Sequence, residues 1–319
     1  MEIVASVSLD LDDLWCYMKI HGDAGWESFP SFLPVVVPRV LKFFEERDQK
    51  ISFMVVGQDA ALPHNQPILK SILDAGHEIG NHSFHHDSWM HLLTNEQIIA
   101  DLVKAEEAIV QAVGKRPIGF RAPGFSISFE VATVLAKRGY IYDGSIFPTF
   151  LGPMARLYYM MTTRLTEEEK SKRKHLFGSF TDGFRSNMAY PWMKEGFSLM
   201  VIPVTTFPIF KMPIHLSYIL YLSLISPALG IFYFETAIRL CRKLRVRPSI
   251  LLHPLDFIGQ DDGIEELKFF PAMKLSHTTK LEIISKTMAI LKRYYRVVTM
   301  EEHARTLLES STWPVYGIR

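Results

Sequence analysis

Short apolar runs alternate with stretches of helical spacing through the first half of the chain, and this alternation constrains the fold most strongly. The apolar runs, rich in β-branched residues, cover residues 3–9, 51–56, 77–80, 118–121 and 140–142. Helical spacing is found between them at residues 33–46, 65–75, 94–113 and 129–138. Strands that alternate with helices in this way predict an α/β fold with a parallel sheet.

The regular alternation of predicted strands and helices ends at about residue 151. A charge run at 166–175 is followed by a nearly continuous apolar stretch at 208–234. The strand and helix patterns return near the end, with predicted strands at 248–253 and 296–299 and a helix at 281–294.

Composition excludes some classes of protein. The 319 residues contain 35 Lys and Arg against 34 Asp and Glu, so no overall charge attracts nucleic acid. Cys16 and Cys241 form no paired motif, which favours a reducing compartment. No basic segment followed by an apolar segment precedes the first predicted strand, so we expect a cytoplasmic protein without a signal peptide.

Chemically active side chains follow several of the predicted strands. In α/β proteins, ligands bind at the carboxyl ends of parallel strands. Five such ends carry an acid, an imidazole or a guanidinium group: Asp10, Asp12 and Asp13; the segment NHSFHHD at 81–87; Arg121; Asp143; and His253.

His82 and His86 are four residues apart. If the segment turns helically, both imidazoles point from one face, as two ligands of one ion must. A carboxylate from another strand end would complete a three-ligand site of the kind that catalytic zinc uses. His85 could substitute in a distorted turn, and the alternative is an exposed polar loop.

Asp10 and Asp12 share one face of an extended segment, which suits one metal ligand and one general base. The alternative is that these acids only cap the strand end. Arg121 needs an anionic partner if it is buried, and Asp10 is a reasonable one. His253 has the chemistry of a general acid, although a single strand-end histidine is more often structural.

The order of five motifs resembles that of the polysaccharide deacetylases of NodB-homology type, carbohydrate esterase family 4. The motifs are SLDLDD, HSFHH, FRAPGF, YDGSIFP and LLHPLDF. The resemblance covers roughly residues 3–150 and 248–305, and the D-x-D-D form of the first motif is that of one branch. It implies a distorted (β/α)7 barrel, to which the apolar stretch would add a helical insertion before the last strands.

The resemblance also implies a role for each matching residue. Asp12, His82 and His86 would bind a divalent metal, most simply Zn²⁺, with Asp13 as the alternative to Asp12. Asp10 would be the general base, Arg121 the residue that orients it, and His253 the general acid. The remaining motif positions would contact the substrate: Pro123, Phe125, Asp143 and Leu252.

These motifs divide the chain. Residues 1–150 and 248–310 would form one catalytic domain, and residues 151–207 an insertion or lid. Residues 208–247 would form an apolar helical hairpin with a basic flank, because Pro227 divides the apolar run into halves too short to cross a bilayer. We expect this hairpin to dip into one leaflet; a buried helix pair or a dimer contact is the alternative.

The predicted function is therefore a metal-dependent N-deacetylase. Its substrate would be an N-acylated amino sugar, expected to be lipid-linked, at the inner face of the cell membrane. One alternative is a hydrolase of a soluble saccharide or small cyclic amide, in which the apolar segment mediates dimerisation. A second is a non-catalytic protein that binds a glycan or lipid.

Overall fold

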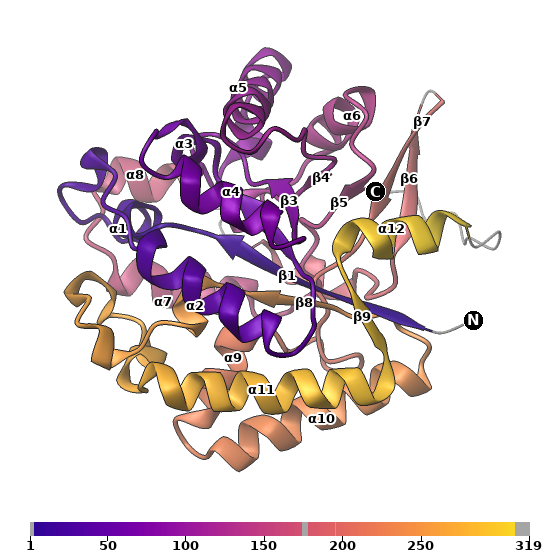
Figure 1. Ribbon diagram of the computed structural model, residues 1–319. Coiled ribbons are helices and arrows are strands. Elements are labelled where there is room, and N and C mark those ends of the chain that lie inside the picture. Colours follow the sequence, from indigo (N-terminus) through magenta and orange to yellow (C-terminus); the bar gives the residue numbers. More distant parts are fainter. Residues whose placement is uncertain (1–2, 174–177, 195, 310–319) are drawn as a thin grey trace.

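A mostly parallel sheet curls into an incomplete barrel with helices on its outside (Figure 1). The computed structural model describes residues 3–173, 178–194 and 196–309. In these ranges the strand order is β6-β7-β5-β4-β3-β2-β1-β8, and β9 also pairs with β1. The strands are β1 Val4–Leu11, β2 Ser52–Val55, β3 Glu78–Asn81, β4 Gly119–Phe120, β5 Tyr142–Asp143, β6 Tyr190–Lys194, β7 Phe197–Val201, β8 Ser249–Leu252 and β9 Arg296–Val298.

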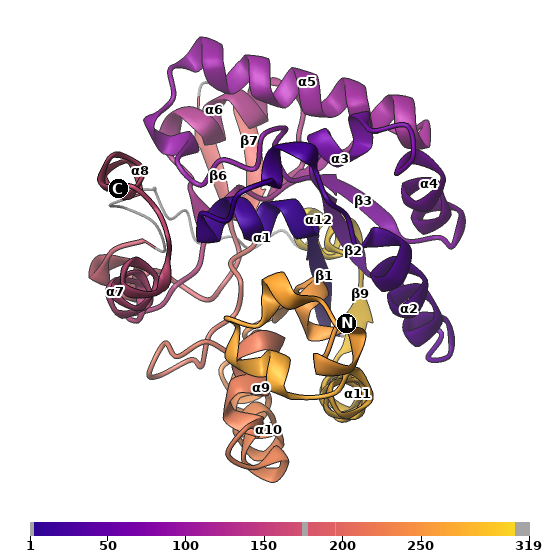
Figure 2. The same ribbon diagram turned by 90° about the vertical axis from the view of Figure 1, so that its left-hand side faces the viewer.

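Helices surround the strands on several sides (Figure 2), as the alternation predicts, with α5 at one side of the barrel and α9, α10 and α11 at the other. The first six helices are α1 Leu14–His21, α2 Leu33–Glu45, α3 Gly57–Ala61, α4 Gln66–Asp74, α5 Asn95–Val113 and α6 Phe129–Lys137. The later six are α7 Gly152–Thr162, α8 Glu167–Lys172, α9 Leu216–Ser223, α10 Pro227–Lys243, α11 His277–Tyr294 and α12 Met300–Glu309.

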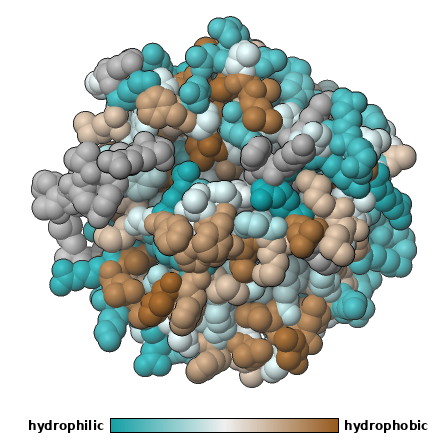
Figure 3. Space-filling model, turned by 180° about the vertical axis from the view of Figure 1, so that it is seen from behind, coloured by the Kyte–Doolittle hydropathy of each residue, from teal (hydrophilic) through white to brown (hydrophobic). Residues whose placement is uncertain are grey.

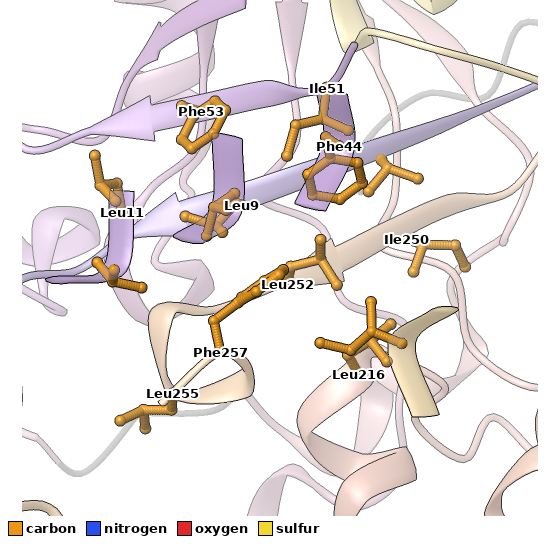
Figure 4. Packing of buried hydrophobic residues seen from close by; sticks show 14 of the residues in the cluster. Leu9, Leu11, Phe44, Ile51, Phe53, Leu216, Ile250, Leu252, Leu255 and Phe257 are labelled. Atoms are coloured by element: carbon orange, nitrogen blue, oxygen red, sulfur yellow. The ribbon is translucent and has the colours of Figure 1, made fainter. Parts of the chain in front are cut away.

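The outer face of the sheet packs against helices through one hydrophobic cluster (Figure 4). Leu9 of β1 is in register with Phe53 of β2 on one side and with Leu252 of β8 on the other. Phe44 of α2 and Phe257, which follows β8, pack over them and are fully buried. Each buried Phe contributes roughly 1.5–3 kcal/mol, so this cluster holds β1 firmly between its neighbours and fixes where β1 ends.

The inner face of the barrel is filled at the amino-terminal ends of the strands. A Cβ atom on Gly119 would lie 1.9 Å from Cζ of Tyr142, so glycine is needed for the ring to cross the barrel. The Tyr142 hydroxyl donates to Glu78 at 2.6 Å, and the Ser52 hydroxyl donates to the other oxygen of Glu78 at 2.5 Å. These buried side chains fill this end of the barrel, and the candidate site lies at the carboxyl ends of the strands.

Part of the predicted insertion belongs to the barrel. β6 and β7 form an antiparallel hairpin, and β7 pairs in parallel with β5. Farther along, the Thr205 amide donates to the Ser249 carbonyl at 2.9 Å, and the Ser249 amide donates to Thr205 Oγ1 at 2.8 Å. The boundary predicted at residue 151 is therefore corrected, since residues 197–205 continue the curved sheet toward β8.

The apolar stretch forms two helices, α9 and α10, with Pro227 in the first turn of α10. Their facing sides are buried, and a Cβ on Gly230 would lie 2.8 Å from the Ile219 carbonyl, so glycine allows close packing. Ile225 at the connection and Phe232 on α10 are 79% and 68% exposed. In the described part of the chain, no helix combines the length and apolar character needed to cross a membrane.

Candidate active site

Three predicted ligands meet at the carboxyl ends of β1 and β3. Asp12 Oδ1 lies 3.0 Å from Nε2 of His86 and 3.3 Å from Nε2 of His82. All three side chains are buried, and their ligand atoms lie close enough together to hold one metal ion. Two imidazole nitrogens and a carboxylate oxygen are a donor set that zinc and several other divalent ions accept.

The turn between the two histidines is not the helix that their spacing suggested. Ser83 and His86 instead adopt left-handed backbone conformations, with φ of 62° and 55°. The Ser83 amide donates to Asn81 Oδ1 at 2.8 Å, and the His86 amide donates to Ser83 Oγ at 3.1 Å. These side-chain bonds hold a tight turn that brings both imidazoles to one carboxylate and leaves His85 exposed.

The tautomer of His82 favours a cation at this cluster. Its Nδ1 lies 2.7 Å from the Arg121 carbonyl, and because a carbonyl only accepts, Nδ1 carries the proton. In the neutral ring, Nε2 then presents a lone pair toward the Asp12 carboxylate. Two acceptors at 3.3 Å repel each other unless a proton or a cation lies between them. The residues present therefore fit a divalent metal.

The electrostatics of the cluster agree with this fit. Burial opposes the charge of Asp12, but the two imidazoles outweigh it and hold the pKa of that carboxyl well below its usual value. Burial likewise opposes protonation of His82, yet Asp10 and Asp12 raise the pKa of its imidazole. Negative charge is therefore concentrated where a positive ion would bind.

Asp13, the alternative ligand, serves the backbone instead. Its Oδ1 accepts from the Leu14 amide at 2.7 Å and from the Phe32 amide at 2.8 Å, so it caps the start of α1. Burial raises the pKa of Asp13 to about 6, against these hydrogen bonds. The structure thus groups Asp12 with the histidines and turns Asp13 away.

Asp10 is paired with Arg121, as the sequence predicts. Arg121 Nη1 lies 2.5 Å from Asp10 Oδ1 and 2.9 Å from Ser8 Oγ, and its Nε donates to the Gly144 carbonyl at 3.0 Å. The Arg121 side chain is completely buried and Asp10 is 4% exposed. A charge-assisted pair of this kind fixes the orientation of the carboxylate.

His253 stands at the end of β8 on the inner side of the barrel. The parallel register pairs Leu9 with Leu252, so the next residues, Asp10 and His253, emerge side by side. The His253 backbone amide donates to Asp256 Oδ2 at 2.8 Å, which fixes the turn after the strand. The side chain is half-buried and therefore accessible to a substrate.

The predicted substrate contacts fall into two groups. Pro123 and Phe125 lie in a short turn after β4, and Phe125 begins a row of rings that leads to His253. The ring centroids are 4.8 Å apart for Phe125 and Phe147, 5.6 Å for Phe147 and His215, and 6.1 Å for His215 and His253. The row connects the turn after β4 with the end of β8.

Asp143 and Leu252 do not belong to this row. Both oxygens of Asp143 accept from Ser145, and the side chain is 1% exposed, so it ties its own loop together. Leu252 shares the outer face with Leu9 and is fully buried in the core, while its neighbour Leu251 lies on the inner face opposite Ser8. The assignment of Leu252 is corrected because side chains alternate along a strand.

Two residues at the site, His215 and Asp256, were not identified from the sequence. His215 was not among the candidate site residues, although it immediately precedes α9 and its ring adjoins His253. Asp256 lies within the motif LLHPLDF, and its spacing of three residues from His253 is that of a capping side chain. That spacing was the available signal; for His215 the sequence offers none.

Comparison with known proteins extends the motif evidence. The model of the polysaccharide deacetylase family matches residues 7–142. A peptidoglycan deacetylase of Helicobacter pylori is 30% identical over 152 residues, which are 46% of this chain and 50% of that protein. A peptidoglycan deacetylase-like protein of Gibberella zeae is 34% identical over 168 residues, 50% of this chain and 47% of that protein. The chain thus spans about half the length of these curated relatives.

The fold is also shared with a solved structure. A crystal structure of a Mycobacterium smegmatis protein assigned to the polysaccharide deacetylases aligns with this chain at a TM-score of 0.63. The alignment covers 100% of this chain and 96% of that protein's chain. At 18% sequence identity this likeness concerns the fold. Residues 7–142 thus match the polysaccharide deacetylase family, and the curled α/β sheet has the fold of that Mycobacterium smegmatis protein.

Proposed function

We propose that this protein is a metal-dependent N-deacetylase that hydrolyses the amide of an N-acylated amino sugar. The observation that carries the proposal is the meeting of three groups at one end of the barrel. These are the Asp12, His82 and His86 cluster, the Asp10 carboxylate fixed by Arg121, and the accessible imidazole of His253. The family match and the peptidoglycan deacetylase relatives support the substrate class.

Each residue has a defined part in the reaction. A divalent metal, which we expect to be Zn²⁺, would supply a Lewis acid that lowers the pKa of water and polarises the amide carbonyl. Asp10 accepts a proton from the attacking water, whose oxygen forms a bond to the carbonyl carbon. His253 donates a proton to the nitrogen as the carbon–nitrogen bond breaks. The products are a carboxylic acid and a free amino sugar.

Activity is tested with metal-loaded protein and a panel of N-acetylated sugars, both soluble and lipid-linked, by mass spectrometry. We expect loss of one acetyl group with the wild type and no loss with Asp10→Asn. Asp74→Asn is the matched control, because Asp74 is an exposed acid at the end of α4 and lies outside the five motifs. Equal turnover by wild type and Asp10→Asn would refute the proposed base.

We further propose that the substrate is lipid-linked and that the protein lies on the cytoplasmic face of the membrane. Hydrophobic side chains gather over the lower half of one face of the molecule (Figure 3). The connection and outer side of α9 and α10 expose Ile225, Leu229 and Phe232, at 79%, 41% and 68%. A helical segment that exposes both apolar side chains and cations suits the interface of an anionic leaflet. The exposed cations of this segment are Arg239, Arg242, Lys243 and Arg245.

The free, buried cysteines Cys16 and Cys241 support a reducing compartment. Vesicle flotation with anionic phospholipid tests the membrane contact, using Ile225→Asp with Phe232→Asp in the full chain. Val35→Asp is the control, since Val35 is a 45% exposed apolar residue on α2. We expect only the double variant to lose binding; equal binding by all forms contradicts the proposal. A dimer that dissociates in the double variant would favour a soluble substrate instead.

A further inference from the structure

We propose that Ser217, in the first turn of α9, is a positioning residue that fixes the tautomer and orientation of the His253 imidazole. Ser217 Oγ lies 2.7 Å from Asp256 Oδ1 and 3.2 Å from His253 Nδ1. The apolar helical pair thereby contributes directly to the acid side of the site. This inference rests on the proposed function, in which His253 is the general acid.

The direction of the two hydrogen bonds follows from the donors available. An ionised carboxylate only accepts, so the Ser217 hydroxyl donates to Asp256. The remaining lone pairs of Ser217 Oγ then accept a proton from Nδ1 of His253. A ring held in this way carries its fixed proton on Nδ1, and Nε2 is the nitrogen that can give a proton to a leaving amine.

Ionisation of Asp256 is supported by its neighbours. Asp256 is 1% exposed, and burial raises the pKa of its carboxyl, whereas His253, Ser217 and Lys280 act in the opposite direction. Lys280 on α11 is fully buried, and its ammonium donates to the Leu255 carbonyl at 2.7 Å. A buried cation so placed favours the charged form of Asp256.

The other imidazole beside His253 does not compete for the proton. Burial, with a smaller effect of His253, lowers the pKa of His215 to about 3. His215 therefore stays neutral at the pH where His253 would act. Asp256 accepts from Ser217, and the neighbouring ring of His215 is neutral. On this side of the site, His253 is therefore the group placed to carry a transferable proton.

α9 is anchored firmly enough to hold the hydroxyl in place. Leu216, Ile219 and Leu220 are fully buried in the main hydrophobic cluster. Ser223, six residues farther along the same helix, provides a matched comparison, because its hydroxyl donates to the Ile219 carbonyl at 2.8 Å within the helix. Loss of the Ser223 hydroxyl perturbs α9 without touching His253.

The test uses Ser217→Ala, Ser217→Thr and Ser223→Ala in the full metal-loaded chain. The first readout is the ¹⁵N spectrum of the histidine rings, with the His253 signals assigned by comparison with His253→Asn. We expect the Nδ1-protonated tautomer in the wild type, in Ser217→Thr and in Ser223→Ala. Ser217→Ala should show a mixed tautomer population. An unchanged spectrum in Ser217→Ala, or the same change in Ser223→Ala, would overturn the inference.

The second readout is the pH–rate profile of deacetylation. We expect Ser217→Ala to lower kcat by about 10- to 100-fold, the range typical of lost supporting contacts, while KM changes less than twofold. Its basic limb should move to lower pH, because the protonated ring loses an acceptor. A fall in kcat without movement of that limb would overturn the inference. The ring spectrum needs no turnover, so a tautomer change without activity on any sugar would count against the proposed function alone.

Discussion

The buried ion pair between Asp10 and Arg121 allows a quantitative test of how this site is held. Removing the guanidinium with Arg121→Met leaves a carboxylate that is only 4% exposed without a partner. Breaking a buried pair from one side destabilises a protein by about 3–5 kcal/mol. The double variant Asp10→Asn/Arg121→Met also removes the stranded charge, so we expect it to be about 1–3 kcal/mol more stable than the sum of the single changes predicts.

The assay is urea unfolding at pH 7 in the presence of a chelator, so that metal binding does not vary between samples. Arg138→Met is the control, because Arg138 pairs with Glu106 at 2.7 Å but is 28% exposed in its side chain. Pairs open to solvent contribute about 1 kcal/mol or less. If Arg121→Met were no more damaging than Arg138→Met, or if the two single changes were additive, the pair would not be the buried interaction described.

Three further predictions concern the metal cluster and the fold. Asp12→Asn should abolish Zn²⁺ binding in titration calorimetry, whereas Asp13→Ala should keep it and lose about 1 kcal/mol of stability as a helix cap. Burial lowers the pKa of His77 to about 4. The unfolded chain therefore takes up a proton at this ring before the folded protein does. The stability that depends on the neutral ring is present above pH 6.5 and is lost as the pH falls through 4. In urea unfolding, the free energy of unfolding should fall by up to about 3 kcal/mol over this pH range. The fall should be smaller in His77→Phe. Gly119→Ala should lower stability by about 1–3 kcal/mol in thermal unfolding, because its Cβ would meet the Tyr142 ring.

Each of these has an outcome that contradicts it. Zinc affinity that falls equally in both aspartate variants would show that Asp13 contributes to the cluster. Identical slopes of stability against pH in His77→Phe and the wild type would show that this ring does not titrate with folding. A Gly119→Ala protein as stable as the wild type would mean that the barrel interior has room to adjust.

The alternation of strands and helices could be predicted from the sequence, because the spacing of apolar residues that marks a strand or a helix involves only residues close together in the chain. The α5 helix follows a Thr94 and Gln97 capping box, and β1 is a buried apolar run, both visible in the sequence. The convergence of His82 and His86 was predicted on helical spacing, yet side-chain bonds within a left-handed turn produce it. Spacing therefore indicated which residues meet but not how the backbone brings them together.

The remaining features depend on contacts between distant segments. Leu252 was assigned to the wrong face because the register of β8 on β1 cannot be read from either strand alone. Ser217 and His215 reach His253 only because α9 packs against the segment after β8. Likewise, β7 joins the sheet through β5, across a stretch of more than fifty residues in which the sequence shows no regular alternation.

The central place of β1 has a consequence for how the protein is made. β1 pairs with β2, which follows within about fifty residues, but also with β8 and β9, which are synthesised more than two hundred residues later. Closing such large loops is entropically slow, and proteins dominated by distant pairings fold slowly. A nascent polypeptide on the ribosome therefore carries Asp10 and Asp12 on a strand with one unpaired edge until β8 and β9 emerge. During that interval Asp12, His82 and His86 can already lie together while His253 is still missing. Under the proposed function, metal binding can therefore precede deacetylation.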